Sequence, residues 1–219
     1  MTALAIDGPA GAGKSTVARA VAGALGWDYV DTGALYRALA LAVIRHGADP
    51  RNEAAVAAVA ARSRIEAEGS RVWLDGAEVT DAIRDRDVTE IVSTVSAHAA
   101  ARAALLSLQR EAAERGDVVM EGRDIGAVVL PEADAKVFLT ATVEERARRR
   151  ALELGLPTDA ATLEAMARSL AARDRADATR AESPLARADD AHVVDTTGLT
   201  TDEVVARICA IATEAGRAR

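Results

Sequence analysis

The chain has 219 residues and a formal net charge of −7, with 34 acidic and 27 basic side chains. This length suits one globular domain with a buried core, and the acidic balance argues against a general nucleic-acid binder, which needs surplus positive charge. Cys209, the single cysteine, has no intramolecular partner, and no apolar run suits a signal sequence or a membrane span. We therefore expect a cytoplasmic protein with no membrane or nucleic-acid partner, and separately we expect a monomer.

The first predicted elements enclose a glycine-rich turn. Residues 2–6 suit a buried strand, residues 14–25 suit a helix, and IDGPAGAGKST at residues 6–16 matches the phosphate-binding pattern GxxxxGK[ST]. Backbone N–H groups of such a loop converge on phosphate oxygens, and the helix adds its positive end. The predicted cofactor-binding residues are Gly8, Pro9, Ala10, Gly11, Ala12, Gly13, Lys14, Ser15 and Thr16.

Within this loop, two side chains carry the predicted chemistry. Lys14 would reach the β- and γ-phosphates, and the Ser15 hydroxyl would be offered to Mg²⁺. Neither lysine follows an asparagine, as it would in a segment that reads guanine, so a GTP switch is disfavoured. The sequence favours ATP as the phosphoryl donor to a small acceptor.

The remaining elements alternate between strands and helices. We expect a short strand at 29–30, a helix over 33–45, a small antiparallel β insertion near 63–92 with the hairpin signal Asp75-Gly76, and a helix over 97–114. Further strands follow at 117–122, 135–141 and 192–195, separated by charged helical segments at 143–155 and 159–182, and a helix over 201–215 closes the chain. This alternation predicts a three-layer α/β fold around a parallel sheet.

Phosphoryl transfer needs cations more than covalent chemistry, so arginines at the expected ligand edge are candidates. Arg37 lies on the helix after DTG, and Arg123 follows the strand VVMEG at its carboxyl end, where open parallel sheets place ligands. The three histidines show no spacing typical of a metal site.

Two charged clusters have two interpretations each. Arg146, Arg149 and Arg150 share a helical face, which could close over a triphosphate or pair with nearby glutamates in water. Arg173, Asp177 and Arg180 also share one side of a helix, which suits either a salt-bridged face or a nucleotide acceptor. The spacing alone leaves both alternatives open.

Six segments together resemble one family, the bacterial cytidylate kinases, which are P-loop nucleoside monophosphate kinases. They are IDGPAGAGKST, DTGALYRA, GRDIGAVVLPEADAKVFLTA, ERARRR, RDRADATRAESPL and VVDTTGLT. The resemblance implies a single domain over 1–219 with a five-stranded parallel core sheet. It also implies a monophosphate-binding lobe at about 31–115 that carries the β insertion, and a helical lid at about 143–182. The implied reaction is ATP + CMP to ADP + CDP, with dCMP as a second acceptor and Mg²⁺ required.

The resemblance also assigns roles to matching positions. It places Thr32, Arg37, Arg123 and Arg180 around the CMP phosphate, Ser93, Arg102 and Asp124 on cytosine, Arg173 and Asp177 on the ribose, and Arg146 and Arg149 on the transferred phosphoryl group. The catalytic set is therefore Lys14, Arg123, Arg146 and Arg149. The chain departs from many relatives at Glu121, where they have aspartate, and at Thr32, where other members have serine.

Overall fold

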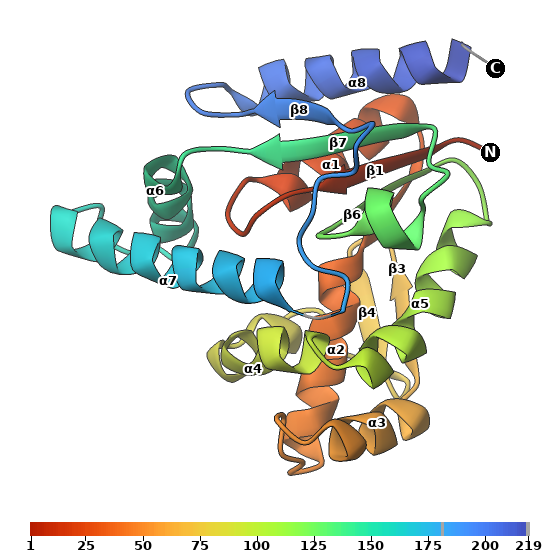
Figure 1. Ribbon diagram of the computed structural model, residues 1–219, viewed down its shortest axis with the longest axis vertical. Coiled ribbons are helices and arrows are strands. Elements are labelled where there is room, and N and C mark those ends of the chain that lie inside the picture. Colours follow the sequence, from red (N-terminus) through yellow and green to blue (C-terminus); the bar gives the residue numbers. More distant parts are fainter. Residues whose placement is uncertain (181, 218–219) are drawn as a thin grey trace.

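The computed structural model describes residues 1–180 and 182–217, and its centre is a parallel sheet (Figure 1). The five strands lie in the order β2-β6-β1-β7-β8. Their bounds are Ala3–Asp7 for β1, Asp28–Asp31 for β2, Val118–Gly122 for β6, Ala135–Thr140 for β7 and His192–Asp195 for β8. The predicted five-stranded parallel sheet is confirmed.

Helices cover both faces of this sheet. Leu4 and Ile6 of β1 pack on the same face as α1 (Lys14–Leu25) and α8 (Thr201–Arg217). Ala5, between them, points to the opposite face, because successive strand side chains alternate. There it joins Met120, the short turn η2 (Ile125–Val129) and α5 (Ala99–Ala113). The layers are thus helix, sheet, helix, as predicted.

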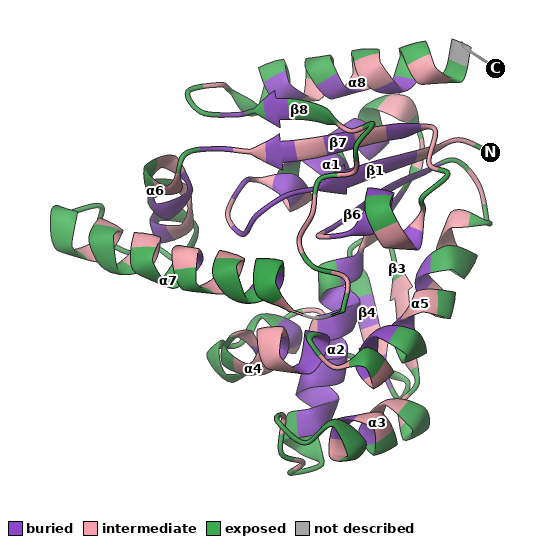
Figure 2. Cartoon of the chain, viewed as in Figure 1, coloured by how far each residue is buried: buried purple, intermediate pink, exposed green. Residues whose placement is uncertain are grey.

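A second lobe surrounds α2 (Thr32–Arg45), which is buried along most of its length (Figure 2). The Asp31 carboxylate caps this helix by accepting the N–H of Ala34 at 3.0 Å. Around α2 pack α3 (Glu53–Arg62), α4 (Arg86–Ser96), α5 and a small antiparallel sheet of three strands. This lobe therefore has its own apolar core, separate from the core of the parallel sheet.

The β insertion is shorter than the range 63–92 predicted for it. Its strands are Ile65–Glu68 (β3), Arg71–Leu74 (β4) and Ala77–Glu78 (β5), and the Asp75-Gly76 turn joins the last two as expected. A 3₁₀ turn, η1 (Ala82–Arg84), and then α4 occupy the rest. Val88, Val92 and Val95 form the buried face of α4, so the prediction that the β insertion extends to residue 92 is wrong. Helix α3 was not predicted.

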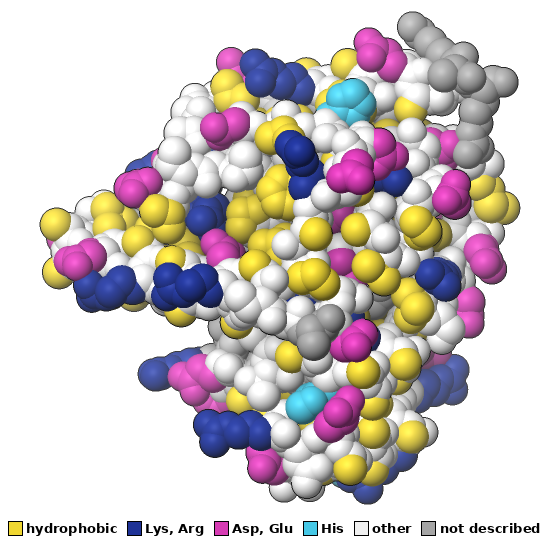
Figure 3. All heavy atoms as spheres, in the orientation of Figure 1, with side chains coloured by type: hydrophobic (Ala, Val, Ile, Leu, Met, Phe, Trp, Pro, Cys, Tyr) yellow, Lys and Arg dark blue, Asp and Glu magenta, His cyan; other side chains and the backbone are white. Residues whose placement is uncertain are grey.

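An arm of two helices projects from the body. It consists of α6 (Val143–Glu153) and α7 (Ala160–Thr179), and Figure 3 shows a notch between this arm and the α2 lobe. Within the described ranges, no single helix is long and apolar enough to cross a membrane; α4 and α5 pass such a test only as a pair, and they meet at 98°. The arm occupies the region predicted to be the lid.

Candidate active site

The glycine-rich loop leaves β1 and enters α1 at the carboxyl edge of the sheet. Gly11 and Gly13 have φ values of 75° and 88°, which favour glycine. At Gly8 a Cβ atom would lie 2.0 Å from the Leu139 carbonyl oxygen, so no larger residue fits against β7. Pro9 and Ala12 belong to the loop but do not line the cleft.

The other loop residues open into a cleft between the sheet, the α2 lobe and the arm. They are Ala10, Gly11, Gly13, Lys14, Ser15 and Thr16. Lys14 is only 6% exposed, and its ammonium group donates to the Pro9 carbonyl oxygen at 2.9 Å. Burial, with Arg123 nearby, lowers the pKa of Lys14 to about 7. An incoming polyanion would therefore strongly favour the charged form.

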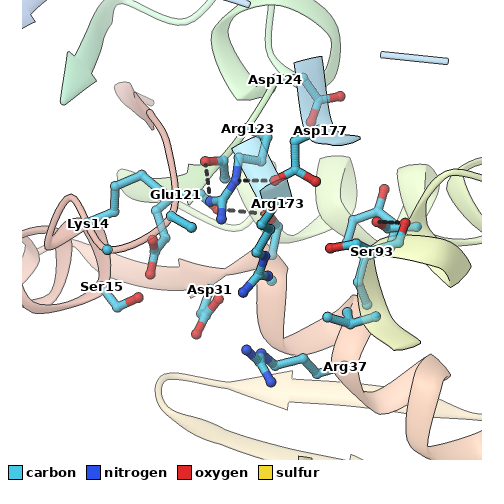
Figure 4. Close-up of a pocket in the computed structure, with 18 of the residues that line it drawn as sticks. Lys14, Ser15, Asp31, Arg37, Ser93, Glu121, Arg123, Asp124, Arg173 and Asp177 are labelled. Carbon is cyan, nitrogen blue, oxygen red and sulfur yellow. Dashed lines mark hydrogen bonds and ion pairs between the residues drawn. The ribbon is translucent and has the colours of Figure 1, made fainter. Parts of the chain in front are cut away.

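A group of oxygen ligands lies beside the lysine. Figure 4 shows Ser15, Asp31 and Glu121 on the same side of the cleft as Lys14. Burial raises the pKa of Glu121, and the Tyr29 hydroxyl donates to its carboxylate at 2.8 Å. Hydroxyl and carboxylate oxygens suit Mg²⁺, which keeps several waters and phosphate ligands of its own. Among the described residues no cluster of three or more His, Cys, Asp or Glu could hold a metal ion by itself.

All nine predicted acceptor residues line this one cleft. They are Thr32, Arg37, Ser93, Arg102, Arg123, Asp124, Arg173, Asp177 and Arg180. They come from α2, α4, α5, the segment after β6, α7 and the residue that ends α7. The structure thus brings together positions that lie up to 148 residues apart in the sequence, the separation of residues 32 and 180.

One part of the cleft wall on the acceptor side is centred on Asp124. Arg102 makes an ion pair with one of its carboxylate oxygens, and Arg180 lies 3.6 Å from the other. The Arg102 guanidinium also lies over the ring of Tyr36, 5.3 Å from the centroid. Asp124 and Arg102 are 4% and 9% exposed, so both are largely buried in the wall of the cleft. Such a carboxylate and guanidinium pair offers an acceptor and donors to a polar ring.

A second part of the wall is cationic. Arg123 Nε donates to Asp177 Oδ2 at 3.0 Å (Figure 4). Burial and the charge of Arg123 lower the pKa of Arg173 to about 10, and the buried Nε of Arg173 has no hydrogen-bond partner among the described residues. Arg37 donates to Thr89 Oγ1 at 2.9 Å. Unbalanced positive charge of this kind suits the binding of a phosphate.

The Thr32 side chain is bound to the backbone of β6, because its hydroxyl donates to the Glu121 carbonyl oxygen at 2.7 Å. Ser93 lines the cleft from α4. Three further charged side chains, to which the sequence analysis gave no role in binding or catalysis, also line the cleft: Arg84, Arg150 and Glu153. Arg150 was within the charged face recognised on α6, whereas no sequence signal marked Arg84.

The predicted lid arginines lie against the phosphate loop, outside the cleft. Arg146 donates to the Ala10 carbonyl oxygen at 2.9 Å and pairs with Asp174 at 2.5 Å. Arg149 donates to Thr196 Oγ1 at 2.8 Å, and its Nη1 atom is 3.7 Å from where a Cβ atom on Gly13 would lie. Of the three arginines on this face, Arg150 is the one that lines the cleft.

Comparisons with known proteins identify relatives of this chain. The cytidylate kinase family model matches residues 4–214. The chain is 50% identical over 211 residues to a cytidylate kinase of Desulfitobacterium hafniense, covering 95% of this chain and 91% of that protein. It is 49% identical over 216 residues to one of Exiguobacterium sibiricum, with 95% and 96% covered. An uncharacterized protein from Eubacterium ventriosum shares the fold, with a TM-score of 0.55 and 14% identity over 97% of this chain and 98% of that one.

Proposed function

Since the chain belongs to the cytidylate kinase family, we propose that it transfers the γ-phosphoryl group of ATP to CMP or dCMP, giving ADP and CDP or dCDP. The observation that carries this proposal is a single cleft in which the phosphate-loop Lys14 faces the nine acceptor-side residues. Holding two phosphates in line lowers the barrier to transfer by positioning and by charge neutralisation. We expect the enzyme to act as a monomer in the cytoplasm.

On the donor side, the loop N–H groups and Lys14 hold the ATP phosphates, and Arg123 neutralises charge that develops on the transferred group. Arg146 already donates to the Ala10 carbonyl oxygen of the loop, and closure of the arm would direct Arg146 and Arg149 to the same phosphates. No covalent intermediate is needed. A general base is also unnecessary, because an oxygen of the acceptor phosphate is ionised at neutral pH.

Ser15 would hold Mg²⁺ together with the phosphates, and Asp31 and Glu121 would act directly or through its waters. When bound, the ion neutralises negative charge on the phosphate oxygens of ATP. The buried Tyr29 hydroxyl keeps the longer Glu121 side chain in place by its 2.8 Å hydrogen bond.

On the acceptor side, Arg37 and Arg180 would bind the CMP phosphate, with Thr32 at the start of α2 beside them. Arg173 and Asp177 would hold the ribose. Cytosine presents an amino donor and two acceptors, and Ser93, Arg102 and Asp124 would satisfy these groups. A buried polar ring that lacks a hydrogen-bond partner binds with a less favourable free energy, so these three side chains can discriminate between cytosine and other bases.

The acceptor is tested by measuring ADP release from ATP and Mg²⁺ in parallel with CMP, dCMP, UMP, AMP, GMP and shikimate. We expect the highest kcat/KM with CMP and dCMP. Turnover of only another acceptor would contradict the proposed substrate. Binding of ATP and CMP without ADP release would identify a nucleotide-binding regulator instead.

Binding of ATP is expected to take up a proton above neutral pH. The pKa of Lys14 is lowered to about 7 by burial and by Arg123, and the ATP phosphates raise it again. Uptake should therefore approach one proton at about pH 8 and be small at about pH 6, where Lys14 is already charged. Calorimetric titrations in buffers of different ionisation enthalpy measure this number. The Lys14→Ala variant is the control, and equal uptake by that variant would contradict the assignment.

A further inference from the structure

Asp7 is a buried carboxylate for which the proposed chemistry has no direct use. It ends β1, is 4% exposed, and immediately precedes the phosphate loop. One carboxylate oxygen accepts the N–H of Ile125 and the other accepts the N–H of Gly126, both at 2.8 Å. Burial raises the pKa of Asp7 to about 6, so at pH 7.5 or so the group is ionised and accepts both bonds.

These two N–H groups open the turn η2, whose N-cap residue is Asp124. An aspartate at an N-cap ordinarily accepts such an N–H with its own side chain. The Asp124 side chain makes no capping bond; its backbone carbonyl oxygen accepts the Val128 N–H at 2.8 Å. Asp7, at the end of β1, caps the turn instead, while the Asp124 carboxylate lines the cleft and pairs with Arg102 and Arg180.

We propose that Asp7 is a positioning residue for acceptor recognition. It caps η2 in place of Asp124, and this leaves the Asp124 carboxylate available to bind the nucleobase of the acceptor. This rests on the proposed function, in which Asp124 contacts cytosine. The same residue ends the strand that carries the phosphate loop, and Gly8 is fixed against the Leu139 carbonyl. Asp7 therefore connects the phosphate loop, which it precedes, with the turn η2, which it caps.

The test is the variant Asp7→Asn, which keeps the shape of the side chain but places an amide NH₂ against a backbone N–H. We expect the KM for CMP to rise ~10-fold or more, as for loss of a charge-assisted hydrogen bond, with the KM for ATP changed by less than about 2-fold. The preference for CMP over UMP should fall as well, because a displaced Asp124 no longer reads the base.

The matched control is Asp134→Asn. Asp134 Oδ2 accepts the N–H of Ala3 at 2.7 Å, at the opposite end of the same strand, so its loss removes a similar bond far from the cleft. Both variants should melt cooperatively, and Asp7→Ser, with a smaller side chain, replaces Asp7→Asn if the amide does not fold. A lower melting temperature with an unchanged KM for CMP would overturn the proposal, since a purely structural role predicts that result.

A double-mutant cycle with Asp124→Asn separates the proposal from its premise. If Asp7 acts through Asp124, adding Asp7→Asn to Asp124→Asn should raise the KM for CMP little further, whereas fully additive effects would overturn the proposal. Amide hydrogen exchange at Ile125 and Gly126 should be faster in Asp7→Asn whichever acceptor the enzyme uses. Faster exchange in a protein whose wild type does not turn over CMP would contradict the proposed substrate but leave the capping role of Asp7 standing.

Discussion

Replacing Lys14 by alanine is expected to lower kcat by ~10²–10³-fold, because a fixed cation near the transferred charge is lost. The fold should survive this change. Among the described residues the Lys14 side chain makes one hydrogen bond, to the Pro9 carbonyl oxygen, and burial disfavours its charged form and lowers its pKa to about 7. Its removal therefore relieves a cost of folding at neutral pH. Initial rates and a thermal melt, measured on the same preparation, check both statements.

The control for this variant is Arg207→Ala, which removes an exposed cation from α8, the helix packed against α1, without altering the lining of the cleft. We expect kcat for this control to stay within about 2-fold of the wild type, since exposed charges are screened. An equal loss in both variants would point to a general effect of charge. Undiminished turnover in Lys14→Ala would remove the phosphate loop from the mechanism.

The phosphate loop could be located from the sequence because local rules govern it. Residues that tolerate positive φ are few, and Gly11 and Gly13 stand where the backbone requires them. The adjacent strand and helix follow from a short apolar run and from a helix-forming segment of ordinary length. The parallel sheet followed from the same kind of alternation, which short connections and right-handed crossovers restrict to few topologies.

The end of the β insertion could not be read correctly because two signals disagreed there. The segment after Thr80 is rich in β-branched residues, which favours strands, yet Val88, Val92 and Val95 repeat at helical spacing. Burial of that apolar face against α2 decides the outcome. Helix α3 carried a usable signal, since Asn52 caps it by accepting the Ala55 N–H at 3.1 Å.

The hydrogen-bond partners of the side chains in the site could not be predicted from residue spacing in the sequence. Helical periodicity correctly grouped the arginines of α6, but Arg146 takes as its partner the Ala10 carbonyl, 136 residues away. Asp7 was read as part of the loop motif, although its carboxylate serves backbone groups 118 and 119 residues later. Such pairings depend on which chain segments meet in the folded protein, and no local pattern encodes them.

Replacing Asp177 by alanine is expected to raise the KM for CMP by ~10–100-fold and the KM for ATP by less than about 3-fold. Asp177 is 5% exposed and accepts from Arg123 at 3.0 Å. The variant would remove the ribose contact and also leave Arg123 beside Arg173 without its counter-ion, so kcat should fall too. Steady-state kinetics with each substrate varied in turn measure both parameters. Equal losses for CMP and ATP would contradict the ribose assignment.

Two further variants identify the cause of that loss. Glu164→Gln, on the same helix, breaks an exposed ion pair with Arg168 and should leave both KM values unchanged, because such pairs contribute little. Asp177→Asn keeps an oxygen that can accept a hydrogen bond from a ribose hydroxyl or from Arg123 but removes the charge. If hydroxyl recognition dominates, Asn should restore most of the affinity for CMP that Ala loses. If the charge on Asp177 is what orders Arg123, the two variants should lose kcat alike, and the aspartate would then act on the transferred phosphoryl group through Arg123.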